Sequence, residues 1–253
     1  SIAVAIALHK KGEVDAVVSA GNTGASVACC ILRLGRLPGI DRPAIATVIP
    51  TPYSPFVLLD SGANVDSKPE MIEQFAIMGE VYARFIIGKD RPRVGLMSNG
   101  TEDSKGTELT KATFKLLQAS PFDFVGNVEG TDLFKDRVDV VACDGFVGNI
   151  VLKTCEGIAK AISGMLRENI MQNSVRKLGY ALAKGAFDDL KVKMDSRSTG
   201  GAPLLGVNGV FVKAHGNSDA YAIKNAIRVA SEVVEKKIND KIIEGVAQVK
   251  LND

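Results

Sequence analysis

The sequence contains no tryptophan and only two histidines, and aromatic residues make up 6% of its 253 residues. Lys and Arg number 31 against 29 Asp and Glu, so the chain lacks the positive balance of a nucleic-acid-binding domain. It also lacks an apolar run long enough to cross a bilayer, and a basic-then-apolar signal segment at its start. From these absences we expect neither a nucleic-acid partner nor a membrane-spanning segment.

Cysteine is also scarce. Cys29, Cys30, Cys143 and Cys155 lie in apolar segments without paired metal-ligand spacing, which is typical of reduced, buried thiols in a cytoplasmic protein. Cys143 has neither a neighbouring histidine nor a CxxC partner, and the sequence has no GxSxG elbow. Because no activated nucleophile is evident, we expect an enzyme that positions two substrates rather than attacking one itself.

What the sequence does have is a repeated order of apolar run, polar turn and helical pattern. The five runs are VDAVVSA (14–20), FVLLD (56–60), RVGLMS (93–98), VDVVACD (138–144) and GVFVKAHG (209–216). Continuous apolar strands alternating with helices indicate an α/β fold, a mainly parallel sheet with helices on both faces. Right-handed crossovers then place the turns at one edge of the sheet, where ligands of open α/β sheets bind.

The turns carry more polar side chains than chain reversal requires. They hold Asn22, Thr23, Asn64, Asp66, Asn99, Thr101, Glu102, Lys105, Asp144, Asn149 and His215. Backbone N–H groups at helix N-termini favour an anion, so phosphate or a carboxylate is the expected ligand type. The alternative, open for any single turn, is that Asn, Thr and Asp only cap helices and that Gly only permits left-handed backbone.

Nucleotide motifs do not fit these turns. In NGTEDSKGTELT the order Lys105-Gly106-Thr107 and the glycine spacing differ from a P-loop, and no glycine triplet has the dinucleotide spacing. Lys105 is either an anion clamp or a solvated loop lysine. His215, after an apolar strand, is either a donor to an oxyanion or proton shuttle, or a structural histidine. His9, in a helix-like segment, is expected at the surface.

With these residues assembled, the sequence resembles the PlsX family, the phosphate acyltransferases of bacterial phospholipid synthesis. The matching stretches are SAGNTGA, GIDRPA, LLDSGANVDSKPE, FAIMG, NGTEDSKGTELTK, FVGNVEG, DGFVGNIVLKT and KAHGNSD, in family order from about residue 16 to residue 230. The N-terminal strand of the family and its DAMGGD turn have no counterpart in this sequence. We expect that missing part to supply another wall of the site.

The resemblance implies transfer of a fatty acyl group from the thioester of acyl carrier protein to inorganic phosphate, without a metal or other cofactor. It implies a fold similar to isocitrate and isopropylmalate dehydrogenases and to phosphotransacetylases. It also implies a homodimer that is cytoplasmic and peripheral at the inner face of the membrane. Two alternatives stay open: an enzyme like a phosphotransacetylase or a dehydrogenase, and a non-catalytic scaffold that docks the carrier protein.

Residue by residue, the resemblance makes Lys105 and Asn149 the first candidates for catalysis or phosphate orientation. Asp144 and His215 follow as orienting or proton-handling groups. The candidates for substrate binding or loop shaping are Asn22, Thr23, Asn64 and Glu102.

The stretch 158–194 breaks the strand-helix alternation and predicts two helices around an apolar middle bordered by cations. Such a segment suits either a dimer interface or the surface of an anionic membrane. For the tip, the resemblance favours peripheral membrane contact through Leu178, Tyr180 and Leu182. We therefore expect an α/β core of residues 1–157 and 199–253 and a helical hairpin of residues 158–198 that faces the dimer partner and the membrane.

Overall fold

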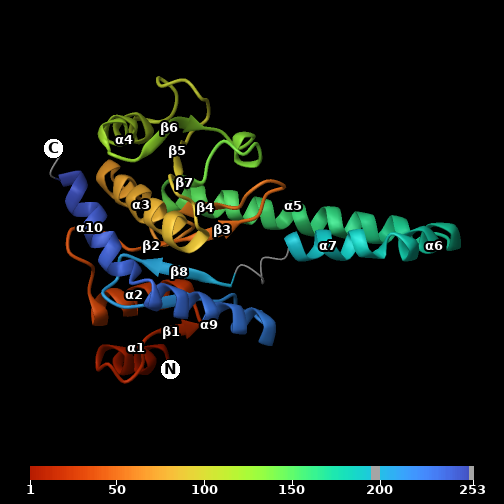
Figure 1. Cartoon of the computed structure of the whole chain (residues 1–253), viewed down its shortest axis with the longest axis horizontal. Helices are drawn as coiled ribbons and strands as arrows, with labels where there is room; N and C mark the ends of the chain where they lie inside the picture. The colour runs from red at the N-terminus through yellow and green to blue at the C-terminus, as the bar shows by residue number, and fades with distance from the viewer. Residues whose placement is uncertain (195–199, 251–253) are drawn as a thin grey trace.

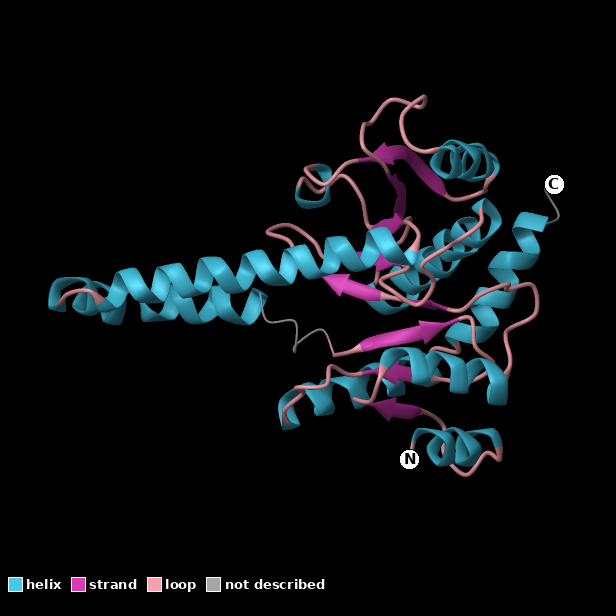
Figure 2. Ribbon diagram, turned by 180° about the vertical axis from the view of Figure 1, so that it is seen from behind, coloured by secondary structure: helices cyan, strands magenta, loops and turns pink. Residues whose placement is uncertain are grey.

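The computed structural model describes residues 1–194 and 200–250. It is a mixed α/β structure with two sheets, in the strand orders β1-β9-β8-β2 and β3-β4-β7-β5-β6 (Figure 1, Figure 2). The strands are β1 (Val17–Ser19), β2 (Ala44–Ile45), β3 (Thr47–Ile49), β4 (Phe56–Leu59), β5 (Arg93–Met97), β6 (Asp123–Val128), β7 (Val140–Ala142), β8 (Ala202–Leu205) and β9 (Phe211–Lys213). The α-helices are α1 (Ile2–Lys10), α2 (Thr23–Leu34), α3 (Pro69–Tyr82), α4 (Glu108–Ala119), α5 (Gly145–Met171), α6 (Ser174–Leu182), α7 (Lys184–Met194), α9 (Ala220–Glu235) and α10 (Ile238–Lys250).

The five apolar runs expected to be strands are confirmed as strands. Each leads into a helix: β1 into α2, β4 into α3, β5 into α4, β7 into α5 and β9 into α9. In the five-stranded sheet β4, β7, β5 and β6 are parallel, and β7 lies between β4 and β5. The turns that follow β4, β7 and β5 therefore meet at one edge of this sheet.

The five-stranded sheet is mainly parallel, as expected, but the expectation that all the polar turns lie at one edge of one sheet is wrong. The segment from Ala44 to Ile49 changes partner along its length: β2 pairs antiparallel with β8, and β3 pairs antiparallel with β4. Between them the N–H of Ala46 donates to the carbonyl of Pro203 at 3.0 Å. The polar turns consequently lie in two groups, one after β1 and β9 and one after β4, β7 and β5.

Helices cover both faces of the five-stranded sheet. On one face Val57, Val94 and Val140 belong to the largest core cluster, which includes much of α3. On the other face Leu58 and Val141 pack with apolar residues of α5. The largest cluster also contains residues of β8, β9, α9 and α10, so one continuous core joins the two sheets.

Helix α5 extends well beyond the sheets, and α6 and α7 return beside it (Figure 1, Figure 2). The expected core boundary at residue 157 lies inside α5, which runs unbroken across it. The second expected boundary, between residues 198 and 199, lies outside the described residues. Among the helices that the structure describes, none combines the length and apolar character needed to cross a membrane.

At the far end of these helices, the three residues of α6 that were expected at the membrane do not all point the same way. The side chains of Leu178 and Leu182 are 63% and 83% exposed. Tyr180 is half-buried, and its ring packs on Phe187 of α7 with the ring centroids 5.0 Å apart. Leu178 and Leu182 therefore share an outer face of α6, whereas Tyr180 faces α7.

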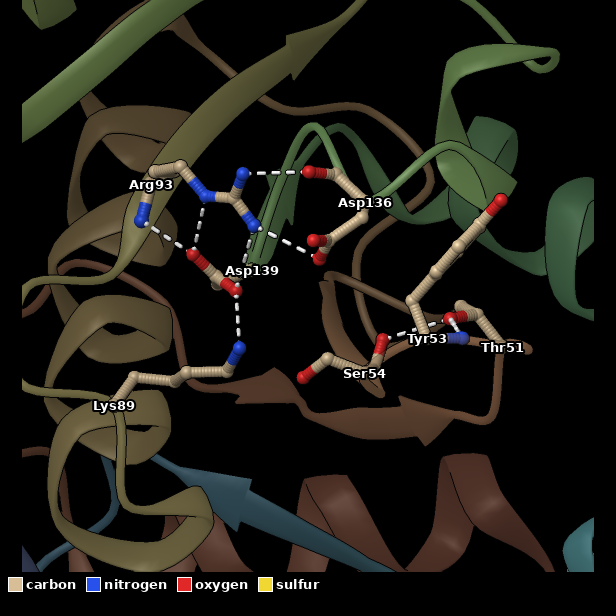
Figure 3. Close-up of polar contacts among 7 residues, drawn as sticks. All are labelled: Thr51, Tyr53, Ser54, Lys89, Arg93, Asp136 and Asp139. Atoms are coloured by element: carbon tan, nitrogen blue, oxygen red, sulfur yellow. Dashed lines mark hydrogen bonds and ion pairs between the residues drawn. The ribbon is translucent and has the colours of Figure 1, made fainter.

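The amino ends of β5 and β7 are fastened by an ion-pair network (Figure 3). The guanidinium of Arg93 contacts the buried carboxylate of Asp139 at 2.8 Å, and Lys89 contacts the same carboxylate at 2.8 Å. Asp136 pairs with Arg93 at 3.1 Å. Burial alone would raise the pKa of Asp139, but the hydrogen bonds from Arg93 and Lys89 outweigh it and lower this pKa to about 2.

His9 is half-buried rather than the surface residue that its helical segment suggested. Its Nδ1 lies 2.9 Å from the carbonyl oxygen of Val14, and its Nε2 accepts a hydrogen bond from the N–H of Val210 at 2.8 Å. Nδ1 therefore carries the proton and donates to Val14. The imidazole holds α1 against the strand region that precedes β9.

Candidate active site

The turn between β4 and α3 is built around the carboxylate of Asp60, which has no exposed surface. The carboxylate accepts hydrogen bonds from the backbone N–H groups of Gly62, Ala63 and Asn64 at 2.6 to 3.1 Å, and from the Asn64 side chain at 2.9 Å. It also accepts one from the N–H of Ile45 at 3.0 Å. Burial raises the pKa of Asp60, and these hydrogen bonds oppose that shift.

The Asp60 turn packs directly on the first turn of α5. The N–H of Gly145 donates to the carbonyl of Asn64 at 2.7 Å. A Cβ built on Gly62 would lie 3.4 Å from the Cβ of Asn149, so the Asn149 side chain rests beside this turn. Two candidates from different turns, Asn64 and Asn149, are thus neighbours of the same loop.

Asp144 has a defined structural role at this point. Its side chain accepts hydrogen bonds from the N–H groups of Phe146 and Val147 at 2.8 and 3.0 Å, which makes it the N-cap of α5. The helix-capping alternative therefore accounts for this aspartate in the structure. These hydrogen bonds hold the start of α5 next to Asn149.

The turn between β5 and α4 presents Lys105 and Glu102. Both are exposed, and both flank Gly100: a Cβ there would lie 2.8 Å from Cγ of Lys105 and 2.9 Å from Oε2 of Glu102. Gly106 follows Lys105 with a φ of +97°, and a Cβ at Gly106 would lie 2.6 Å from Thr110. A glycine is therefore required directly after Lys105, both for backbone conformation and for space.

The second group of polar turns stands at the ends of β1 and β9, which are parallel neighbours. Asn22 is the N-cap of α2 and accepts from the N–H of Ala25 at 3.0 Å, while Thr23 begins the helix. His215 is exposed, and its Nδ1 accepts from the N–H of Asn217 at 3.2 Å. Asn22 and Thr23 thus lie close to His215, because the backbone pairing of β1 and β9 places their turns side by side.

Lys213 at the end of β9 was not singled out from the sequence. Its ammonium donates to the carbonyl of Ala214, and burial lowers the pKa of Lys213. This half-buried cation lies two residues before His215. The sequence signal for Lys213 was a lysine at the end of an apolar run. Lysines at that position are also common in strands that carry no site, so the signal did not single it out.

The structure therefore assembles the candidates as two groups. The first contains Asn64, Glu102, Lys105, Asp144 and Asn149, on three adjoining turns of the five-stranded sheet. The second contains Asn22, Thr23 and His215. Ala63 links them, because this residue of the Asp60 turn packs against the core cluster that contains Val17 of β1 and Phe211 of β9.

Cys143 lies beside the Asp60 turn as a buried strand residue, as the sequence suggested. Its Sγ is 3.8 Å from the carbonyl oxygen of Asp60, and burial raises the pKa of Cys143 well above its ordinary value. The group is a neutral thiol at neutral pH and is unsuited to be a nucleophile. Within residues 1–194 and 200–250, no three His, Cys, Asp or Glu side chains are grouped as metal ligands.

Known sequences similar to this chain include a protein family and several phosphate acyltransferases. A family described as "Fatty acid synthesis protein" matches residues 1–241. The phosphate acyltransferase of Syntrophotalea carbinolica is 55% identical to this chain over 243 residues, and that of Geobacter sulfurreducens is 54% identical over 244 residues. Each alignment covers 96% of this chain and 70% of the relative.

Solved structures with a similar fold include phosphotransacetylases. A phosphotransacetylase from Streptococcus pyogenes superimposes with a TM-score of 0.59 and 18% identity, covering 92% of this chain and 67% of that one. The EutD phosphotransacetylase from Staphylococcus aureus gives a TM-score of 0.54 and 14% identity, covering 98% of this chain and 67% of that one. At these identities the likeness concerns the fold alone.

Proposed function

The chain belongs to the PlsX family of phosphate acyltransferases and is an acyltransferase, and from this premise we propose that it takes its acyl group from acyl carrier protein. The carrier holds a fatty acyl chain as a thioester, and inorganic phosphate accepts it. The product is acyl phosphate, which enters phospholipid synthesis.

The observation that carries this proposal is the meeting of three polar turns at the carboxyl ends of β4, β7 and β5. They bring an exposed ammonium, that of Lys105, to the same edge as the exposed amide of Asn149, while the amide of Asn64 donates to Asp60 and Pro43 and shapes the turn. A flexible cation and an exposed amide donor suit a phosphate dianion. The same donors suit the oxyanion that forms when a thioester is attacked.

In the proposed reaction a phosphate oxygen attacks the thioester carbonyl carbon. The carbonyl oxygen becomes an oxyanion, the carbonyl reforms as the C–S bond breaks, and the carrier thiolate leaves with the electron pair and takes up a proton, which balances the one that the attacking hydrogen phosphate loses. We assign Lys105 to holding phosphate and Asn149 to donating toward phosphate or the oxyanion. His215 supplies the proton or a second donor, Asp144 holds the start of α5, and Asn22, Thr23, Asn64 and Glu102 shape the binding surface.

We further propose the organisation of an isocitrate or isopropylmalate dehydrogenase, with residues 1–157 and 199–253 as the α/β core and residues 158–198 as an inserted hairpin. The protein would act as a homodimer through α5. Exposed apolar side chains recur along that helix at Phe146, Ile150, Ile158, Ile162 and Met165, each 49% to 56% exposed. Ile158, Ile162 and Met165 are spaced by four and three residues and lie within about 60° of one another around the helix, so these three form one apolar stripe.

The tip formed by α6 would touch the membrane at its inner face, in the cytoplasm. Leu178 and Leu182 are the exposed residues for this contact, and Val175 extends the same face with 80% of its side chain exposed. Tyr180 stabilises the tip through Phe187 rather than facing outward. Such a position would place a lipid-soluble product next to the bilayer.

Two other functions remain to be distinguished. A phosphotransacetylase-like enzyme would transfer a short acyl group to or from phosphate with a small thiol carrier, and the fold of the structural neighbours accommodates that. A scaffold would bind the carrier without turnover, whereas either enzyme would lose turnover on Lys105→Ala while still binding its carrier. Lys105 therefore separates the scaffold from both enzymes.

The test is to incubate the purified protein with palmitoyl-acyl carrier protein, with and without phosphate. Free thiol release and hydroxylamine-trapped acyl phosphate are measured together, and acetyl-coenzyme A is offered in parallel. Phosphate-dependent appearance of both products from the carrier supports the proposal. Turnover with acetyl-coenzyme A alone would replace it by the phosphotransacetylase function, and no turnover with bound carrier would replace it by the scaffold.

A further inference from the structure

Asn127, near the end of β6, reaches from the sheet to the turn that carries Lys105. Its side chain has no exposed surface. The Nδ2 group donates to the carbonyl oxygen of Glu102 at 2.9 Å, and the backbone N–H of Lys105 donates to the same oxygen at 3.0 Å. One carbonyl thus joins the buried amide of Asn127 directly to the backbone of Lys105.

Burial of the Asn127 amide does not stabilise the core. The Oδ1 atom of Asn127 is buried and has no hydrogen-bond partner within the part of the chain that the structure describes. A buried polar atom without a partner costs about 1–3 kcal/mol. An apolar side chain of similar volume would avoid this cost, so the one contact that the amide gains, the Glu102 carbonyl, is the feature that favours asparagine here.

The surroundings leave the Lys105 turn few alternative conformations. Gly106 sits over Ser98, the residue after β5, where a Cβ would be 3.1 Å from the serine oxygen. The N–H of Ser98 donates to the carbonyl of Val128, which follows Asn127. The turn is therefore held at Glu102 by Asn127 and at Gly106 by close packing over β5.

We propose that Asn127 is a positioning residue for the reaction: it fixes the turn so that Lys105 points its ammonium at phosphate. This inference deepens the proposed function and rests on its assignment of Lys105. Removal of the amide would leave the sheet intact, release Glu102 and let Lys105 move. A displacement of about 1 Å is enough to lower turnover about 100-fold.

The experiment is a double-mutant cycle of Asn127→Leu and Lys105→Ala, with Asn127→Ala as a second variant if leucine does not fit. Asn127→Leu is expected to lower kcat/KM for phosphate by about 10-fold to 100-fold, with an unchanged KM for acyl carrier protein. In the Lys105→Ala background the same substitution is expected to cause no further loss. Thr113→Val, at a buried polar residue of α4 whose hydroxyl bonds Leu109, is the matched control and is expected to keep full turnover.

Equal losses in both backgrounds, or no loss in the first, would overturn the inference. Amide hydrogen exchange of residues 102–107 gives a readout that does not depend on turnover, and Asn127→Leu is expected to accelerate it. Unchanged exchange would also overturn the inference. If exchange accelerates but Lys105→Ala keeps full turnover, the assignment of Lys105 in the proposed function fails, and the role of Asn127 in catalysis fails with it.

Discussion

Gly148 of α5 lies so close to the carbonyl oxygen of Asp60 that an added Cβ atom would be 1.9 Å from it. The Cβ would also lie 3.0 Å from the Sγ of Cys143. Backbone of the Asp60 turn and backbone of α5 are therefore in direct contact, with no side chain between them. This contact determines how Asn64 and Asn149 lie relative to each other.

Gly148→Ala is expected to push the Asp60 turn away from α5. We expect the free energy of unfolding to fall by about 1–3 kcal/mol, because the added carbon overpacks a rigid contact, and turnover to fall as well. Urea denaturation followed by circular dichroism measures the first effect, and the acyl phosphate assay measures the second.

Gly157→Ala provides the control, because this glycine lies further along the same helix with no atom within 4 Å of an added Cβ. It is expected to stabilise the protein by about 0.5–1 kcal/mol, since alanine is the better helix former. An equal effect of both alanines would contradict the close contact as the cause.

Lys105→Ala is expected to lower kcat/KM for phosphate by about 100-fold while leaving the denaturation midpoint unchanged. The exposed side chain contributes little to packing, so under the proposed function its loss removes the phosphate ligand without destabilising the fold. Lys111→Ala is the matched control: it removes a lysine of α4 that is paired with Glu108, and full turnover is expected. A similar loss in both variants would point to general charge rather than to a specific contact.

Much of the five-stranded sheet could be predicted from the sequence because most of its strands are continuous apolar runs. Both faces of the sheet are buried, with Val57 and Val140 on one face and Leu58 and Val141 on the other, and this makes each strand a continuous apolar run. The polar residue that ends each run, such as Asp60 or Asp144, then marks the start of a turn.

Other features depend on contacts that no local pattern encodes. The segment containing β2 and β3 is short and changes partner at Ala46, so the division into two sheets left no sequence signal. His9 looked like a surface residue because its partners, Val14 and Val210, are fixed only when β9 is in place. Asn127 lies in the stretch FVGNVEG, yet the role proposed for it depends on a carbonyl 25 residues away in the sequence.

The Arg93 network makes stability dependent on acidic pH. The pKa of Asp139 is about 2 in the folded protein and near 3.8 when unfolded, so between these values the unfolded chain binds a proton that the folded one does not. Its stabilisation is thus complete above about pH 4 and declines as the pH falls toward 2. Asp139→Asn should be less stable than the parent at pH 5, and the difference should shrink at pH 3.

Urea denaturation at both pH values measures this difference. Asp123→Asn is the control, since its partner Arg91 is 3.8 Å away and both side chains are exposed. An exposed pair of this kind contributes little, so the control should match the parent at each pH. A difference between Asp139→Asn and the parent that stays constant from pH 5 to pH 3 would refute the assignment to this carboxylate.

The apolar stripe on α5 predicts self-association. Ile158→Glu combined with Ile162→Glu should shift the protein from dimer to monomer in sedimentation velocity, because two carboxylates would have to be desolvated in the interface. Lys160→Glu is the control: residue 160 lies between the two isoleucines in sequence but on the opposite side of the helix. If only the double variant dissociates, α5 contributes the interface through this stripe. Dissociation by Lys160→Glu as well would indicate that net charge, not the apolar contact, controls assembly.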